Sequence, residues 1–515
     1  MKKLTLSVAL LLSGTYLFAQ SSTSNVTQAN AIGGAINKAT VTQTGLNHNS
    51  NVDQGNNNSS ATLANENRAT VTQSNPSPYT IGTNDSQIKQ RGYGQQATVN
   101  SLGDENGSDI DQAGRDHRAT VGQIGKRNDS EIDQTGRDNR STIDQNGYDN
   151  MSEVTQSDRG NRAFVEQDYI DNESRITQSG GNTGLSGSTA NVKQDGTENI
   201  SDVRQVGTGF GGNSAIVDQF GAYNTSDVDQ NGTGNGADVE QDGFRNKSWV
   251  DQDDNLNSAE VTQTGDDNTS RVKQSGAIIF GNEADVVQTG NLNNSDVLQR
   301  GRLNDADVNQ VGNSNISDVD QVDNLNQADV DQLGDGNNAK VNQDGHTLSG
   351  NDAVVWQQGN TNTAVVTQTG RNEGFVTQIG NLNGATLTQT GNDNWAKLHQ
   401  YGNSNSFTVT QTGDDNKVTG IPSGPVGDFY GAAQTGNNNI GVISQNGDDL
   451  LSQSWQNGNS NRLDVIQSGF DQNSIVWQTG NSNVANLTQS GNGHMSNITQ
   501  NGGANSGIVI QANGL

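Results

Sequence analysis

The sequence predicts an all-β fold, a β-solenoid built from two facing sheets. Three observations predict it: a strict recurrence of glutamine, an alternation of inward and outward residue types before each glutamine, and a glycine and an asparagine after it. Glutamine stands at positions 112, 123, 134, 145, 156, 167 and 178, a spacing of eleven residues. The phrase reads Ser/Ala-x-Val/Ile/Leu-x-Gln-x-Gly-x-x-Asn-x. About 42 copies run from Ser24 to Gln511, including two in which Asn65 and Ser101 hold the Gln position.

Each phrase opens with five residues that suit a strand. Successive side chains of a strand point to opposite faces, so positions one, three and five share one face. Those positions hold Ser or Ala, an aliphatic residue and Gln, whereas the two positions between them are mostly Asp, Thr, Glu, Lys, Arg or Asn. We therefore expect an inward face of aliphatic and amide groups and a charged outward face.

The second half of the phrase suits a turn. Gly two places after Gln and Asn five places after it both tolerate positive φ. A unit of eleven residues is too short for a crossover helix between parallel strands. The units must then stack directly on one another, as they do in a solenoid.

A longer period sets the number of strands per coil. From Ala163 to Ala328 the first strand position alternates between Ala and Ser, so two phrases make one coil of about 22 residues with one strand in each sheet. About 21 such coils would form a rod of roughly 100 Å. In two representative coils the expected core residues are Ser201, Val203, Gln205, Ala215, Val217, Gln219, Ser317, Val319, Gln321, Ala328, Val330 and Gln332.

Insertions interrupt the period at a few places. Extra residues are expected between Gly and Asn after Gln178, Gln205, Gln274, Gln343 and Gln411, in each case after the Ser-type strand. All five loops should then protrude along one lateral edge. Insertions after Gln28 and Gln73 are expected to follow the other strand type.

Composition narrows the class of protein. The 515 residues carry a formal charge of −29 and only 29% of them are apolar, so any fold must need little apolar mass per residue. The acidic balance argues against a nucleic-acid partner, because no basic footprint is present. The chain has no cysteine, which excludes disulfides and thiolate metal sites.

The first twenty residues differ from the rest. Lys2 and Lys3 precede the apolar run 4–12, and a small residue, Ala19, lies near the end of the segment. This pattern predicts a secretory signal peptide over residues 1–20, followed by the solenoid over 21–515. No other segment has the roughly 20 apolar residues of a membrane span, so we expect an extracellular protein exported by a Sec-type route.

The two ends of the solenoid carry strand phrases without a capping helix. Ser24, Val26 and Gln28 lie in the first phrase, and Val509 and Gln511 in the last. An uncapped strand edge can template another chain. We therefore expect these residues to be the polymerising ends of a head-to-tail homopolymer.

Two consecutive copies of the phrase resemble the curlin repeat, Ser-x5-Gln-x-Gly-x2-Asn-x-Ala-x3-Gln. Residues 201–219 match it with an insertion, and residues 226–241 match its residue types with one residue fewer before the first Gln. The resemblance implies a subunit of curli, the functional amyloid fibres used in adhesion and in the biofilm matrix. It also implies other curli-type subunits and an outer-membrane secretion pore as partners. The chain departs from the family pattern in its length of about 21 repeats.

Three other patterns could mark functional sites: outward aspartates, Thr-x-Thr pairs and outward tryptophans. The outward aspartates lack the calcium β-roll pattern and often lie one coil from a basic residue, which favours a solvated, charge-balanced face over a metal site. The Thr-x-Thr pairs at 40/42 and 70/72 are interrupted by charges along their columns, which disfavours ice binding. Outward aromatics before Gln suggest an adhesive stripe for glycans or fibre bundling, or simply residues that favour strands; they are Trp356, Trp455 and Trp477.

No catalytic constellation and no cofactor site is predicted. The leading hypothesis is a self-assembling structural protein. The alternative is a monomeric solenoid adhesin that binds glycans or surfaces through one sheet face or its loop edge, and a polysaccharide-active enzyme is disfavoured by the uniform outward face.

Overall fold

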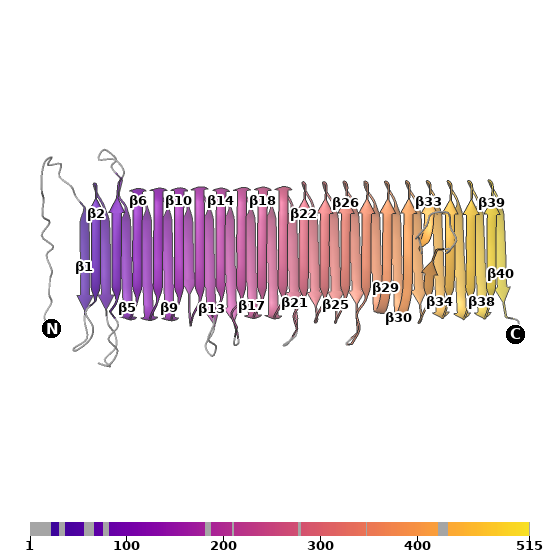
Figure 1. Cartoon of the computed structure of the whole chain (residues 1–515), viewed down its shortest axis with the longest axis horizontal. Helices are drawn as coiled ribbons and strands as arrows, with labels where there is room; N and C mark the ends of the chain where they lie inside the picture. Colours follow the sequence, from indigo (N-terminus) through magenta and orange to yellow (C-terminus); the bar gives the residue numbers. More distant parts are fainter. Residues whose placement is uncertain are drawn as a thin grey trace.

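The computed structural model describes residues 22–29, 37–55, 66–75, 82–180, 187–208, 211–276, 280–346, 348–420 and 431–513. These residues form 40 strands and, within the described ranges, no helix. Figure 1 shows the strands side by side along a rod, with β1 at one end and β40 at the other. The predicted β-solenoid is confirmed, with about 20 turns of about 22 residues each.

The strands of the first half of the rod are β1 (Thr23–Ala29), β2 (Lys38–Thr44), β3 (Asn49–Gly55), β4 (Arg68–Ser74), β5 (Asp85–Tyr93), β6 (Gln96–Asp104), β7 (Gly107–Arg115), β8 (Arg118–Lys126), β9 (Asp129–Arg137), β10 (Arg140–Tyr148), β11 (Met151–Gln156), β12 (Arg162–Ile170), β13 (Glu173–Gly180), β14 (Thr189–Thr197), β15 (Ile200–Gly207), β16 (Ser214–Ala222), β17 (Thr225–Thr233), β18 (Gly236–Phe244), β19 (Lys247–Asn255) and β20 (Ser258–Asp266).

The second half contains β21 (Thr269–Ser275), β22 (Glu283–Thr289), β23 (Asn294–Arg300), β24 (Asp305–Val311), β25 (Ile316–Val322), β26 (Gln327–Leu333), β27 (Asn338–Asp344), β28 (Asp352–Gln358), β29 (Thr363–Ile379), β30 (Gly384–Tyr401), β31 (Ser406–Thr412), β32 (Lys417–Thr419), β33 (Ala432–Thr435), β34 (Ile440–Asp448), β35 (Leu451–Asn457), β36 (Arg462–Phe470), β37 (Asn473–Thr479), β38 (Val484–Asn492), β39 (Met495–Asn501) and β40 (Ser506–Ala512).

Pairing is parallel and in register between strands that are two phrases apart. Ser317, for example, lies beside Ser295 on one side and Ala339 on the other. Two sheets result. The first sheet holds the odd-numbered strands from β1 to β27, the first halves of β29 and β30, and β31, β34, β36, β38 and β40. The second sheet holds the even-numbered strands from β2 to β28, the second halves of β29 and β30, and β32, β33, β35, β37 and β39.

The strands are longer than the five residues expected, because most extend over seven to nine residues into the turns. Burial alternates along them. In β25 the inward Ser317, Val319 and Gln321 are at most 2% exposed, and the residues between them are partly exposed. All twelve core residues named from the sequence are at most 2% exposed. The core is therefore a narrow space of aliphatic, amide and small side chains between the sheets.

The glycine of the phrase is required by the stacking of turns. Gly312 has a φ of 125°, and a Cβ added to it would lie 2.1 Å from the carbonyl oxygen of Gly334 in the next coil. With this backbone no side chain fits there. Asp254 and Asp323 take the same position in the phrase with a different backbone, at φ of 70° and 65°, which residues with short polar side chains can adopt.

Four of the expected insertions lie where the sequence places them. They follow β13, β15, β21 and β27, which are all strands of the first sheet and end on the same lateral edge of the rod. The fifth placement is wrong. The turn after Gln411 is regular, and the extra residues lie inside a strand: Val418 pairs with Ala396 and Ala432 with Leu398, so residues 420–431 are inserted opposite the single step at Lys397.

The beginning of the chain also needs a correction. Asn65 lies outside the described residues. β2 pairs directly with β4 and β3 with β5, so neither sheet has a further rung at this place. A strand at Asn65 would add one step to the alternation between the sheets and so assign every earlier strand to the opposite sheet. The expected strand type of the Gln28 insertion is therefore wrong, because β1 lies in the same sheet as β13, whereas Gln73 does lie in the other sheet.

Candidate functional site

The glutamines form two hydrogen-bonded ladders inside the rod, one unbroken in the first sheet and one with a single gap in the second. In the first sheet, Gln299 Nε2 donates to Gln321 Oε1 at 2.9 Å, and Gln321 Nε2 donates to Gln343 Oε1 at 2.9 Å. The second Nε2 hydrogen reaches a backbone carbonyl across the core, as from Gln321 to Asp305 O at 2.8 Å. Each buried amide thus has partners in three strands, which removes the cost of burying it.

Both ladders have the same direction along the rod. At every Gln–Gln step the residue nearer β1 donates and the residue nearer β40 accepts, from Gln28 to Gln54 at one end and from Gln489 to Gln511 at the other. The acceptor atoms of Gln28 and Gln43 therefore face one end of the described stack. Donor atoms of Gln500 and Gln511 face the other end.

Asparagines form a second pair of ladders at the turns. Asn315 Oδ1 accepts the backbone N–H of Asn337 at 3.0 Å, and Asn315 Nδ2 donates to Gly334 O at 2.8 Å. His117 takes this position in one coil. Its Nδ1 accepts the N–H of Asn139 at 3.3 Å, and burial lowers the pKa of the imidazole. The neutral ring therefore replaces Asn in the ladder.

One rung of the Gln ladders is irregular. Ser101 stands at the Gln position of β6, and its Oγ donates to Gln123 Oε1 at 3.1 Å. The short side chain cannot reach back to Gln73, whose Nε2 instead donates to Asn49 O, Asn84 O and Ser86 Oγ. The ladder of the second sheet is thus interrupted between β4 and β6.

The residues named as polymerising ends lie in the outermost strands of the described stack. Ser24, Val26 and Gln28 are exposed in β1, and Val26 is 43% exposed although it occupies a core position. Val509 and Gln511 in β40 are partly buried. These strands have one free edge each, because β1 pairs with β3 and β40 with β38.

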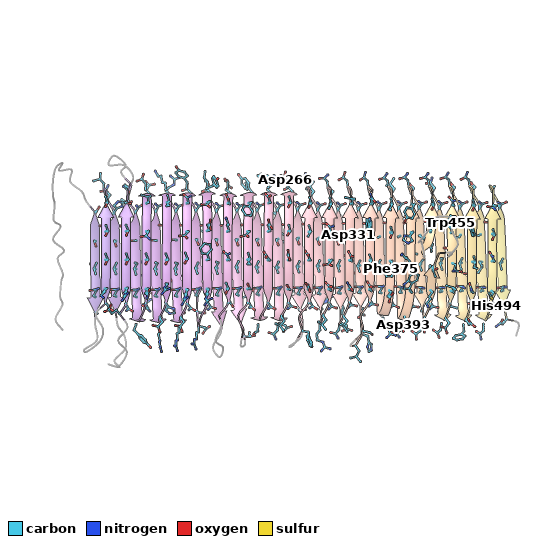
Figure 2. The ribbon with its side chains drawn as sticks, viewed as in Figure 1. Asp266, Asp331, Phe375, Asp393, Trp455 and His494 are labelled. Carbon is cyan, nitrogen blue, oxygen red and sulfur yellow. The ribbon has the colours of Figure 1, made fainter. Side chains whose placement is uncertain are left out.

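The outward faces carry rows of ion pairs between neighbouring coils. Lys273 Nζ lies 2.5 Å from Asp251, and Lys340 Nζ lies 2.5 Å from Asp318. Where carboxylates stack without a cation their charge is disfavoured: burial, together with Asp331 and Asp307, raises the pKa of Asp329 to about 6. Figure 2 shows such side chains repeated in rows along the rod.

The three tryptophans do not form one stripe. Trp455 and Trp477 lie on neighbouring rungs with ring centroids 4.9 Å apart, but Trp356 lies on β28, with three rungs of the second sheet between it and Trp455. Their exposure also differs, since Trp356 is 49% exposed and Trp455 is 7% exposed. Phe375 and Trp395, which the sequence reading did not single out, form a further aromatic pair with centroids 6.1 Å apart.

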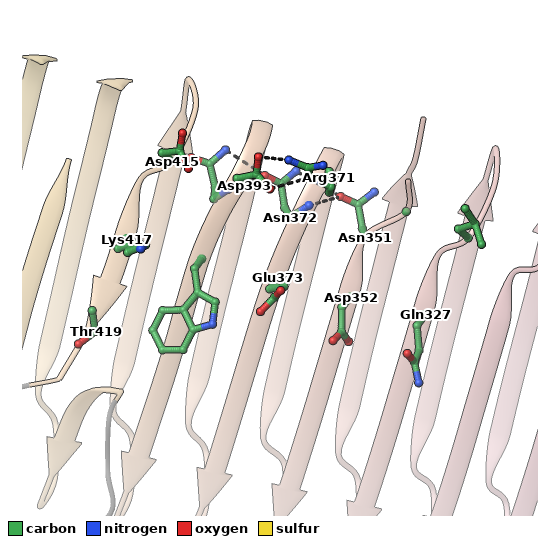
Figure 3. Close-up of a pocket in the computed structure, with 14 residues that line it drawn as sticks. Gln327, Asn351, Asp352, Arg371, Asn372, Glu373, Asp393, Asp415, Lys417 and Thr419 are labelled. Atoms are coloured by element: carbon green, nitrogen blue, oxygen red, sulfur yellow. Dashed lines mark hydrogen bonds and ion pairs between the residues drawn. The ribbon is translucent and has the colours of Figure 1, made fainter. Parts of the chain in front are cut away.

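A hollow of about 800 Å³ lies on the second sheet, at the turns that lead into β26, β28, the second halves of β29 and β30, and β32 (Figure 3). Its floor is a column formed by the residue that starts each second-sheet rung. Asp352, Glu373, Trp395 and Lys417 belong to this column. Burial and the neighbouring Glu373 raise the pKa of Asp352. An indole beside carboxylates suits a polyhydroxylated or cationic ligand.

Metal and membrane features are absent from the described part of the chain. No group of three or more His, Asp or Glu residues there could hold a metal ion. The same residues include no helix with the length and apolarity that a membrane crossing requires.

Comparison with known proteins adds one match. The family model described as curlin associated repeat matches residues 103–136, 125–157, 212–243, 281–312, 296–322, 371–400, 380–413, 391–419 and 458–491. The matched segments lie in both halves of the rod. No curated protein matches the chain.

Proposed function

Because the chain is a curlin-repeat protein, we propose that it is a secreted structural subunit that stacks end to end with its own copies into curli-like amyloid fibres. These fibres would lie on the cell surface and support adhesion and a biofilm matrix. Residues 1–20 would direct export, and an outer-membrane pore would complete it. The role is structural and not catalytic, as is usual for curlin-repeat solenoids.

One observation carries the proposal. The Gln ladders run through the rod in one direction and reach its terminal strands with acceptors at the β1 end and donors at the β40 end. A second copy in the same orientation offers the complementary atoms. Two copies in opposite orientations would bring donor against donor or acceptor against acceptor, so head-to-tail growth is favoured.

Backbone and side chain act together at such a junction. Each added strand pairs its N–H and C=O groups with a free strand edge, and identical amide side chains stack as they do in cross-β assemblies. Ser24, Val26, Gln28, Val509 and Gln511 would become as buried as the core residues of the interior coils.

The test is direct observation of assembly. Residues 21–515, purified under denaturing conditions and transferred to buffer, should form unbranched fibres that bind a cross-β dye and give a diffraction spacing of about 4.7–4.8 Å. Since the net charge of −29 retards association, added salt should shorten the lag phase. Persistent monomers at micromolar concentration would contradict the proposal.

The hollow at Trp395 favours a second candidate, a solenoid adhesin that binds glycans while monomeric. This candidate expects glycan-array binding that Trp395→Ala abolishes and that Trp249→Ala, on the first sheet, leaves unchanged. Binding that is equal in both variants would exclude the hollow as its site.

A further inference from the structure

The two sheets of the described stack hold unequal numbers of rungs. When the long strands β29 and β30 are counted as two rungs each and β32 with β33 as one, the first sheet has 21 and the second has 20. The stack both begins and ends in the first sheet, at β1 and β40. The next vacant position along the coil lies in the second sheet, on the free edge of β39.

This odd count restricts how a second copy can continue the rod. If the copy keeps the same rotational setting, its β1 stacks on β40 and its β2 cannot reach β39, so one strand is missing from the second sheet. The seven-residue edge of β39 would then stay unpaired inside the fibre. Buried unpaired backbone groups are rare, because they lose their hydrogen bonds to water and gain none in return. A copy turned by half a turn about the rod axis places β1 on β39 and β2 on β40, and no strand is missing.

The residues of the end strands match the turned arrangement. The core-spanning part of β1 reads Ser24-Asn-Val-Thr-Gln28, and that of β39 reads Ser496-Asn-Ile-Thr-Gln500. The two differ only by Val and Ile. In β40 the corresponding residues are Gly507-Ile-Val-Ile-Gln511, which share only Val and Gln with β1. Stacking of like residues in register is the arrangement that cross-β ladders favour.

The columns of small core residues give a second, independent match. In the first sheet this column is Ser from Ser24 to Ser317 and contains no Ser from Ala339 to Gly507. In the second sheet it begins with Ala39 and ends with serines at 452, 474 and 496. The serine column thus changes sheets along the rod. Only a half-turn brings Ser496 onto Ser24 and Gly507 onto Ala39, so that each column continues across the junction.

We propose that successive copies of this chain join with a half-turn about the fibre axis, β1 on β39 and β2 on β40. This inference rests on the end-to-end assembly proposed above and specifies its interface. One side of the fibre then shows the first sheet of one copy and the second sheet of the next. The fibre repeat is two copies long.

Cysteine cross-linking tests the junction. The chain has no cysteine, and Asn25 and Asn497 are both exposed outward residues at opposite ends of the rod. In the turned arrangement they become in-register neighbours about 4.8 Å apart, within the Cα separation of about 4.4–6.8 Å that a disulfide spans. Fibres of Asn25→Cys/Asn497→Cys should therefore give covalent ladders of multimers when they are oxidised. The matched variant Asn25→Cys/Ile508→Cys, which reports β1 on β40, should stay monomeric on a denaturing gel.

Each outcome decides a separate point. Fibres that cross-link only in the Ile508 variant, or in neither variant, overturn the half-turn and leave end-to-end assembly standing. Absence of fibres from the unmodified chain overturns the proposed function, and the half-turn with it. As a readout without end-strand substitutions, gold attached to a single Asp251→Cys should alternate between the two sides of the fibre from copy to copy; labels on one side only would overturn the proposal.

Discussion

Two stretches of the first sheet share a Gln ladder and an aliphatic core column but differ in the charge of their outward faces. At the two outward positions between the core residues, β15 to β27 carry charges at eleven of fourteen sites, including Asp318, Asp320 and Lys340. The first-sheet strands from β29 to β40 carry one, Asp464, among fourteen; most of the others are Thr, Val and Ile. The Gln ladder continues through both stretches, at 2.9 Å from Gln321 to Gln343 and at 2.8 Å from Gln389 to Gln411.

The difference shows that the core determines the fold and leaves the outward positions free. Charged rows keep neighbouring sheets apart, because like charges repel and must be desolvated on contact. The uncharged stretch lacks that protection. Four substitution experiments test how far the core and the outward face are independent.

The largest effect is expected from a charge in the core. Val319→Asp in the charged stretch and Leu387→Asp in the uncharged stretch each bury a carboxylate at a site that is 0% exposed. Each should lower the free energy of unfolding by several kcal/mol, and by similar amounts, because the outward face contributes little. Denaturant unfolding followed by circular dichroism measures this, with the exposed Thr390→Asp as control; a clearly smaller loss at Leu387 would contradict independence.

Interruption of a Gln ladder should have the next largest effect. Gln321→Leu and Gln389→Leu keep the side-chain size but leave the Nε2 and Oε1 of neighbouring glutamines without a partner. We expect about 1–3 kcal/mol for each group left unsatisfied. The exposed Gln358→Leu is the matched control in the same unfolding experiment. Equal stability of all three variants would show that the ladders do not stabilise the rod.

Acidity should stabilise the row of carboxylates on the second sheet, to which Asp329 in β26 belongs. The folded-state pKa of Asp329 is raised to about 6 from an ordinary value of 3.8, so its ionised form destabilises the fold. The penalty is present above pH 6 and disappears as the pH falls through 6 towards 4. The melting temperature should therefore rise between pH 7.5 and 5.5, and Asp329→Asn should reduce that rise. Asp344→Asn, which removes an exposed carboxylate, is the control; an unchanged rise in Asp329→Asn would contradict the assignment.

The smallest effect concerns a single surface ion pair. Lys340 and Asp318 are both more than 40% exposed, so solvent screens their attraction. Lys340→Met should change the free energy of unfolding by less than about 1 kcal/mol, and 1 M salt should remove the difference. A loss comparable to that of Gln321→Leu would show that the face does contribute to the fold.

Most of the fold could be predicted because the same pattern of strand and turn residues recurs along nearly the whole chain. Gln at a constant spacing, with Gly and Asn after it, is enough for the strand, the turn and the two-strand coil. The structural position of residues that depart from the repeat was harder to predict. Val418 and Ala432 could each stand at the first core position, usually Ser or Ala, or at the second, usually aliphatic. The sequence therefore could not show that residues 420–431 are inserted between these two positions of one strand. Asn65 suits a Gln position in type, and only the pairing of β3 with β5 excludes it.

The candidate site was predictable in its residues and less so in its contacts. Burial of Gln followed from the pattern. Asn was expected at the turn for its tolerance of positive φ, but positive φ falls on the residue before it, as at Ser314 before the buried Asn315. The direction of the ladders depends on amide orientation, which no sequence states. Trp455 occupies an outward position as expected and is nevertheless 7% exposed, because exposure depends on neighbouring residues that the repeat does not specify.

The interrupted rung at Ser101 has a mechanical consequence. A fibre pulled along its axis carries the load through its rungs in series, so the weakest rung sets the tensile strength of the whole. Gln–Gln bonds join β2 to β4 and β8 to β10, whereas β4 and β6 are joined by backbone pairs and the turn bond from Gln95 N–H to Asn67 Oδ1, without a Gln–Gln bond. Single-molecule stretching should therefore part the rod first at this place, and Ser101→Gln should raise the force at which it does so.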